Sequence, residues 1–369
     1  MQFSPKINTL LLCVYILLVI AYTAFGLSVT SFVGLMEWSI MILFVTVLAF
    51  KKGYVRSVIW YMIAVMVFLL LHVMNADTSL LTAGLFLVNI LLFLFLPDLH
   101  VNVRVIAYLL FVLLIVNFIV GFREVLYSPF ASTVDEYFSG FFQNSNTNGN
   151  FACCVLAAVL LLLKNRKVRI CTISLFLVYL FACKSRNALL FTLLVVYFYN
   201  ILSCKKLAKF ALPSFIMILA GSLFYLAVIE PAVDADFEVF GKSGNSAGRS
   251  VQILLAMSRF PVTFFGVGAT VPNDYVTAVT EFAIHNMYVN TFYAMGWGYI
   301  VLFFIFVFKL YCLLHSNLAK AFLMSFLMYF IFEPGTAFGT QLVVSLPFII
   351  LLIKLGQEKY ENRTLHLEF

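Results

Sequence analysis

One histidine and two asparagines lie where a long polar segment meets an apolar run. They are His285, Asn286 and Asn290. An unperturbed imidazole titrates near neutral pH, which suits a general base. Asn286 and Asn290 are four residues apart and would share one helix face. This pattern predicts a base at His285 and substrate-binding groups at Asn286 and Asn290, with a merely interfacial histidine as the alternative. Glu281 would orient His285, or act as the base itself, if the helix extends back that far.

Basic residues offer a second kind of chemistry, which is the binding of anions. Lys184 and Arg186 occupy a short turn between two apolar runs, and Arg249 and Arg259 lie in the long polar segment. The arginine fork binds two phosphate oxygens at once. We predict that Arg186 and Arg249 hold an anion and that Lys184 or Arg259 assists. Pairing with the acidic stretch 234–238, or snorkelling, is the alternative.

The other polar motifs give weaker signals. Asp234 and Asp236 have the spacing of metal ligands, but they lie in an acidic, solvated stretch, and the seven cysteines show no metal-ligand spacing. We therefore predict neither a metal site nor a cofactor. The Gly266-x-Gly268 pattern lacks the strand and helix context of a nucleotide site. The alternating asparagines of 144–150 suit turns and a helix cap.

The elements that must position these residues are membrane helices. Hydrophobic residues make up 64% of the 369 residues and charged residues 11%, with 42 phenylalanines and a mean hydropathy of +1.06. A soluble domain has about 25% charged residues. A soluble fold cannot hide this much apolar surface, so a bilayer must act as its solvent. The sequence predicts an all-α integral membrane protein whose 369 residues form a single polytopic domain.

Apolar runs near the length of a membrane span recur along the chain. The first is too long for the core of a signal peptide, so we expect it to be retained. We predict twelve transmembrane helices, at 7–26, 30–50, 57–74, 80–97, 105–122, 147–163, 170–183, 187–203, 210–229, 285–308, 320–332 and 339–354.

The distribution of basic residues supports the count of twelve. With the N-terminus in the cytoplasm, seventeen of the 23 basic residues fall on the cytoplasmic side. Six fall on the outer side: Arg123, Lys184, Arg186, Lys242, Arg249 and Arg259. Because cytoplasmic loops carry an excess of Lys and Arg, we expect both termini in the cytoplasm. The same bias explains the net charge of +7 without nucleic acid.

Two predicted outer loops exceed ordinary turn length, at 121–146 and 230–284. Such loops are usually functional or disordered. Within the larger loop, 250–265 is apolar with a helical period, yet it is too short to span. We expect an amphipathic helix there, near 250–260, lying on the outer surface over a cavity.

The order of these motifs resembles that of the O-antigen polymerase and O-antigen ligase superfamily. Gly266 and Gly268 are followed by His285 and Asn286 at the entry to a span, and then by a glycine-containing helix. The turn at 185–190 and the element at 246–252, which contain Arg186 and Arg249, resemble two further family elements. In the second, the family's aromatic residue is replaced by Ile253 or Leu254. The resemblance covers roughly 140–300.

The resemblance implies a metal-independent glycosyltransferase of the bacterial inner membrane. Its substrate would be a glycan carried on undecaprenyl diphosphate and used at the periplasmic face, with inversion at the anomeric carbon. A membrane protein that regulates chain length would be a candidate partner.

Several functions stay open at this stage. A polymerase of surface polysaccharide such as O-antigen, for lipopolysaccharide biosynthesis, is favoured slightly by the divergent motifs and the small size. An O-antigen ligase that transfers glycan to lipid A core is the alternative within the superfamily. A polysaccharide flippase or transporter is an alternative of another class, although transporter sites usually lie near the midplane in broken helices. An assembly scaffold would leave the outer arginines unexplained.

Overall fold

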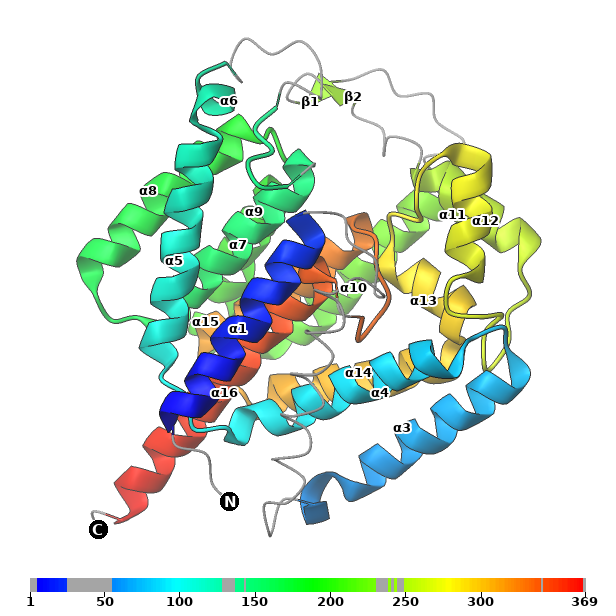
Figure 1. Cartoon of the computed structure of the whole chain (residues 1–369), viewed down its shortest axis with the longest axis horizontal. Helices are drawn as coiled ribbons and strands as arrows, with labels where there is room; N and C mark the ends of the chain where they lie inside the picture. Colours follow the sequence, from blue (N-terminus) through cyan, green and yellow to red (C-terminus); the bar gives the residue numbers. More distant parts are fainter. Residues whose placement is uncertain are drawn as a thin grey trace.

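The computed structural model is almost entirely helical (Figure 1). It describes residues 5–24, 55–127, 137–142, 144–229, 238–239, 242–243, 249–339 and 341–367. The predicted span at 30–50 and the acidic stretch at 234–236 lie outside these residues. Two short strands, β1 (Glu238–Val239) and β2 (Lys242–Ser243), pair antiparallel.

The helices follow the predicted spans closely. Up to the large loop they are α1 (Pro5–Ala24), α3 (Val55–Asn75), α4 (Leu80–Phe95), α5 (Val103–Val120), α6 (Phe122–Tyr127), α7 (Ser145–Leu162), α8 (Arg166–Ala182), α9 (Arg186–Ser203) and α10 (Ala211–Phe224). After it come α11 (Arg249–Arg259), α12 (Val271–Thr280), α13 (Met287–Met295), α14 (Trp297–Leu313), α15 (Asn317–Tyr329) and α16 (Leu342–Leu367). Short 3₁₀-helical turns extend α4 at Leu96–Asp98 and α15 at Phe330–Phe332. A π-helical turn extends α10 at Tyr225–Ile229.

Side-chain caps explain where several helices begin. Asn144, Ser185 and Asn286 precede α7, α9 and α13, and each side-chain oxygen accepts a hydrogen bond from a backbone N–H of the first turn. The first N–H groups of a helix have no partner within it, so such a cap stabilises the helix by about 1 kcal/mol. The capping expected in the asparagine-rich segment 144–150 is confirmed at Asn144.

Five helical segments are long and apolar enough to cross a membrane: Leu80–Asp98, Val103–Val120, Ser145–Leu162, Arg186–Ser203 and Ala208–Val228. Shorter apolar helices occupy Pro5–Ala21, Trp60–Asn75, Trp297–Leu313 and Asn317–Phe332. In Ser145–Leu162, 83% of the residues are buried, against 17% in Ala208–Val228. The first is therefore central, and the second turns apolar side chains outward, as a lipid-facing helix does. This supports a helical membrane protein.

The predicted span 285–308 is wrong as a single helix. It is broken at Gly296, where φ is +86°. A Cβ there would lie 2.2 Å from the carbonyl oxygen of Phe264, so only glycine fits. Strand-like hydrogen bonds fill the break: Val267 N–H donates to Tyr293 O at 2.9 Å and Gly298 N–H to Phe264 O at 3.2 Å. The Gly-x-Gly segment thus docks into the junction of α13 and α14.

A buried histidine holds the other side of that segment. His72, at the end of α3, donates from Nδ1 to the carbonyl of Phe265. Its Nε2 accepts from the Thr78 hydroxyl at 2.8 Å. The Thr78 oxygen in turn accepts the backbone N–H of Ala269 at 2.8 Å. Both imidazole nitrogens are therefore used in joining the α3–α4 turn to 265–269.

Segments assigned to the same side by the charge pattern contact one another. Near the start of α1 and the end of α16 (Figure 1), Lys359 lies 3.5 Å from Asp98, and the backbone N–H of His315 donates to Glu358 at 2.8 Å. At the opposite end, the Tyr329 hydroxyl bonds Asn146 O at 3.4 Å. These contacts lie at two opposite ends of the helical bundle.

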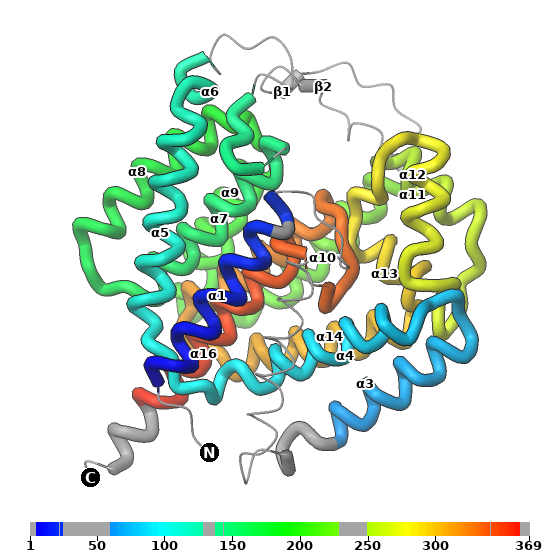
Figure 2. The backbone as a smooth tube through the Cα atoms, viewed as in Figure 1, coloured from blue at the N-terminus to red at the C-terminus, as the bar shows by residue number. Residues whose placement is uncertain are grey.

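The large loop carries two helices, α11 and α12, where one was expected. The prediction of a helix near 250–260 is confirmed by α11. Its Ile253 and Ala256 are buried, whereas Val251, Leu254 and Met257 are exposed. The tube in Figure 2 shows α11, α12 and α13 gathered at one corner, apart from α5, α7, α8 and α9. We call α11–α13 the corner region.

Candidate functional site

The first turn of α11 points two polar side chains inward. Arg249 and Gln252 are three residues apart and so share a helix face. Gln252 is 3% exposed, and its Oε1 accepts the backbone N–H of His285 at 3.0 Å. The guanidinium of Arg249 lies over the ring of Phe332, 5.8 Å from its centroid. The loop helix is therefore joined to the entry of α13 and to the end of α15.

His285 is held in one tautomer. Its Nδ1 lies 2.7 Å from the carbonyl oxygen of Ala283. A carbonyl only accepts, so Nδ1 carries the proton and Nε2 keeps its lone pair. Burial, and then the positive charge of Arg249, lower the pKa of His285 below its ordinary value of 6.5. The imidazole is thus neutral near pH 7 and able to accept a proton at Nε2.

A buried carboxylic acid, Glu333, completes the arrangement. It follows the last turn after α15 and is 3% exposed. Asn187 donates from Nδ2 to its Oε1 at 2.5 Å, and the Tyr329 hydroxyl also hydrogen-bonds it. Burial raises the pKa of Glu333 above its ordinary value, while the Arg249 charge and these hydrogen bonds oppose that rise.

Arg249 interacts electrostatically with both His285 and Glu333. We call Asn187, Arg249, Gln252, His285 and Glu333 the polar cluster. It combines a neutral base, an acid and a cation next to one another. Such a set suits the removal of a proton beside an anionic group.

The other predicted anion-binding residues lie at varying distances from the cluster. Arg186 begins α9 directly beside Asn187. Lys184 lies over the ring of Tyr137, 4.6 Å from its centroid. Arg259 ends α11 over the ring of Tyr275 at 5.7 Å. Ten residues of helix separate Arg259 from Arg249, which amounts to about 15 Å. The structure therefore brings Arg249 and the start of α9 to the site, but not Arg259.

Glu281 does not stand one helical turn before His285. It ends α12 with a left-handed φ of +64°, and helix α13 begins only at Met287. Its side chain is exposed. The helical continuity assumed for a Glu281–His285 pair is wrong, because the chain between α12 and α13 is a loop.

The two predicted asparagines have different surroundings. Asn286 caps α13 through Oδ1, which accepts from Val289 N–H at 3.0 Å. Asn290 donates to the Gly335 carbonyl at 2.9 Å and to the Thr336 hydroxyl oxygen at 3.2 Å. Asn286 thus fixes the start of the helix behind His285. Asn290 anchors the loop 333–339 that carries Glu333.

Two more side chains fix that loop. Asn89 of α4 donates to the carbonyls of Phe338 at 2.7 Å and Gly339 at 3.0 Å. The Thr291 hydroxyl oxygen accepts Ala337 N–H at 2.8 Å. Phe338 has φ +60°, which costs a bulky residue about 1–3 kcal/mol. A strained backbone conformation persists only where several surrounding contacts hold it in place. The hydrogen bonds from Asn89 and Thr291 supply such contacts, so the loop is held rigidly.

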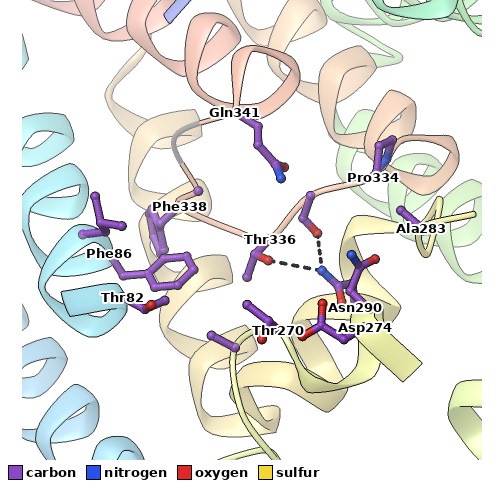
Figure 3. A pocket seen from close by; sticks show the side chains of 15 residues that line it. Thr82, Phe86, Thr270, Asp274, Ala283, Asn290, Pro334, Thr336, Phe338 and Gln341 are labelled. Atoms are coloured by element: carbon purple, nitrogen blue, oxygen red, sulfur yellow. Dashed lines mark hydrogen bonds between the residues drawn. The ribbon is translucent and has the colours of Figure 1, made fainter. Parts of the chain in front are cut away.

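A cavity of about 290 Å³ lies against this loop. Figure 3 shows side chains of α4, α12, α13 and the loop around it, with Asn290 and Thr336 joined by a hydrogen bond. It adjoins the polar cluster along the chain, since Ala283 and Pro334 line it. No residue of α11 lines this cavity, which lies beside α12 and α13.

Sequence reasoning missed Glu333, Asn187 and Gln252. For Glu333 one signal was present, because it stands directly after the predicted span 320–332. A carboxyl group at the edge of a membrane helix is costly and is by default functional. Asn187 and Glu333 are 146 residues apart in sequence, and no local pattern predicts that they meet.

The described residues contain no group of three or more His, Cys, Asp or Glu side chains placed to hold a metal ion. Within those ranges, the convergence of a base, an acid and a cation is the principal chemical feature of this end of the molecule. No protein family model and no curated protein matches the chain.

Proposed function

We propose that the protein is a metal-independent glycosyltransferase that polymerises lipid-linked oligosaccharide units. In this proposal the chain crosses the bacterial inner membrane twelve times with both termini in the cytoplasm. Loops 121–146 and 230–284, and with them the polar cluster, face the periplasm. The observation that carries the proposal is that the first turn of α11 presents Arg249 and also Gln252, whose Oε1 accepts the backbone N–H of His285 at 3.0 Å.

The reaction would start at the acceptor sugar. His285 Nε2 removes the proton of an acceptor hydroxyl as its oxygen attacks the anomeric carbon of the donor glycan. The bond between that carbon and the diphosphate oxygen breaks, and the undecaprenyl diphosphate leaves with the electron pair. Attack from the face opposite the diphosphate inverts the anomeric centre. No metal is needed to activate the hydroxyl.

The leaving diphosphate gains negative charge as the bond breaks. Fixed cations stabilise that charge most in the transition state, which is how they accelerate the step. Arg249 and Arg186 hold the diphosphate in this proposal. The Glu333 carboxyl is a positioning group, because it interacts with Arg249 and with Asn187, which adjoins Arg186 along the chain.

The divergent motifs and the small size of the chain favour a polymerase over a ligase. A base beside an anion-binding side chain suits both reactions, and the motif order at 185–298 is shared with the ligases, which use lipid A core as acceptor. A membrane protein that regulates chain length would then act on the product distribution.

The test is complementation of a strain that lacks the chain. Loss of a general base typically lowers the rate about 10²–10⁴-fold. His285→Ala should therefore leave lipid A core with a single repeat at normal protein levels. His315→Ala is the matched control, because His315 lies at the opposite end of the bundle and uses its backbone N–H to bond Glu358.

The outcomes separate the alternatives. Wild-type chain lengths from His285→Ala would refute the assigned base. Core without any repeat would point to a ligase. Accumulation of lipid-linked repeats on the cytoplasmic side would point to a flippase.

A further inference from the structure

The cavity beside loop 333–339 is lined in a way that suits a hydroxyl-rich ring. Thr270, Thr336, Asn290 and Gln341 supply hydroxyl and amide groups, and these are both donors and acceptors. Phe86 and Phe338 supply apolar surface (Figure 3). At about 290 Å³ the cavity is near the lower end of the roughly 300–1,000 Å³ range of ligand sites. Its size fits one or two sugar rings rather than a whole repeat unit.

One buried acceptor in its wall has no partner. Asn290 is 5% exposed, and its Nδ2 is fully used by Gly335 and Thr336. Its Oδ1 has no hydrogen-bond partner among the described residues. A buried unsatisfied acceptor costs about 1–3 kcal/mol, and a ligand hydroxyl removes that cost. This side chain therefore points to a ligand that donates hydrogen bonds.

The charge of the wall is as informative as its polarity. Among the described residues that line the cavity, Asp274 is the one ionisable side chain. A phosphate or a carboxylate there would meet a like charge and no cation. In the proposed function, anionic groups are held instead at Arg249, in the polar cluster. The two neighbouring sites would then divide the substrates by charge.

Short segments of backbone join the two sites. Ala283 lines the cavity and also accepts the Nδ1 proton of His285. Pro334 lines it directly after Glu333. The cavity wall therefore contains a residue two positions before the base and a residue directly after the acid.

We propose that this cavity binds the acceptor sugar and selects a neutral ring over an acidic one. The proposal rests on the glycosyltransferase function and names the acceptor subsite of the same site. The ring lies against the wall that contains Phe86 and donates a hydroxyl to Asn290 Oδ1. Asp274 accepts another hydroxyl and repels a uronic acid.

Binding is measured without turnover, so the result does not depend on catalysis. The full chain in lipid nanodiscs is titrated with methyl glucoside, methyl galactoside, methyl N-acetylglucosaminide and methyl glucuronide, followed by ligand-observed NMR. At least one neutral glycoside should bind with millimolar affinity, and methyl glucuronide should bind at least tenfold more weakly. Gln341→Leu and Thr270→Trp should each weaken neutral binding at least fivefold.

Asp274→Asn should bring the affinity for methyl glucuronide to within about threefold of that for the neutral glycosides. Asp274, Thr270 and Gln341 are exposed, so these variants should fold. Asp77→Asn is the control, because Asp77 is an exposed acid at the same end outside the cavity wall. Equal binding of acidic and neutral glycosides by the wild type would overturn the proposal. So would binding that Gln341→Leu and Thr270→Trp leave unchanged, or binding of none of the four.

His285→Ala should bind the neutral glycoside as the wild type does. Normal polymerisation by His285→Ala together with cavity-dependent binding would refute the assigned base and leave the subsite standing. If His285→Ala abolishes polymerisation but the protein binds no glycoside, the assigned base stands and the acceptor subsite is refuted.

Discussion

The central helices and the corner region are built in different ways. Around α7, α9 and α15, aromatic side chains interlock, and Phe191 lies 4.7 Å from Phe326 between ring centroids. The corner region has only a small apolar cluster of its own: Ala256, Val276, Ile284 and Tyr293. Its helices also join the main apolar core, through Ile253 of α11 and through Met287, Tyr288, Ala294 and Met295 of α13. The polar cluster takes Asn187 and Glu333 from the first region and Arg249, Gln252 and His285 from the second.

The polar cluster therefore lies at the boundary between the central helices and the corner region. The central helices present the acid, and the corner region, whose own apolar cluster is small, presents the base and the cation. Changes in the central helices should therefore reduce stability, whereas changes in the corner region should reduce activity with little effect on folding.

The largest expected effect is on the central side. Phe191 is 1% exposed, and truncation of a buried phenylalanine costs about 3–5 kcal/mol. Phe191→Ala should thus lower the thermal unfolding temperature strongly in detergent. Phe292→Ala, in the corner region and half-buried, is the comparison variant. Equal losses in the two variants would break the contrast between the regions.

Arg249→Ala should reduce the rate of polymer formation roughly 30- to 1000-fold, or about 2–4 kcal/mol, through loss of transition-state charge stabilisation. Arg249→Lys should also impair activity, because it loses the bidentate fork. Arg186→Ala tests the second assigned arginine. Arg259→Ala, at the far end of α11, should stay near wild type. Near-normal polymer from both Arg249→Ala and Arg186→Ala would reject the diphosphate site.

Glu333→Gln should lower activity about tenfold, since a hydrogen bond involving a charged group contributes roughly 1.5–3 kcal/mol, part of which the amide retains. The measurement that tests the role of Glu333 is the dependence of activity on pH. Replacement of the Glu333 carboxyl by an amide removes an acidic group that interacts with Arg249, so the fall of activity at acidic pH should move to lower pH. A profile with an unmoved limb would make Glu333 structural only.

The smallest effect concerns the acidic limb of the pH profile, that is, the fall in wild-type activity as the pH is lowered. The pKa of His285 lies below 6.5, so the neutral base persists at mildly acidic pH, and activity should fall only as the pH drops through that lowered pKa. In the residual activity of Arg249→Ala the limb should move to higher pH, because a like charge is gone. A limb above pH 6.5 in the wild type would contradict this environment.

Hydropathy predicted most helices, because burial in lipid leaves a continuous apolar run. It could not predict the break at Gly296, since the run continues through it and the cause is the approach of 263–268. The helix at 249–259 was predictable from its period. Glu333 was not assigned, because its significance depends on Asn187 and Arg249, which lie far away in sequence. Periodicity reports which face of a helix is apolar and not which helix it meets.

The double anchoring of 263–269 has a consequence for biosynthesis. His72 and Thr78 are made about 190 residues before their partners at Phe265 and Ala269. The same segment then waits for the 293–298 junction, whose hydrogen bonds form only when α14 has been made. During translation the His72 imidazole therefore has Thr78 close by in the chain, but it lacks its Phe265 partner until about 190 more residues have been made.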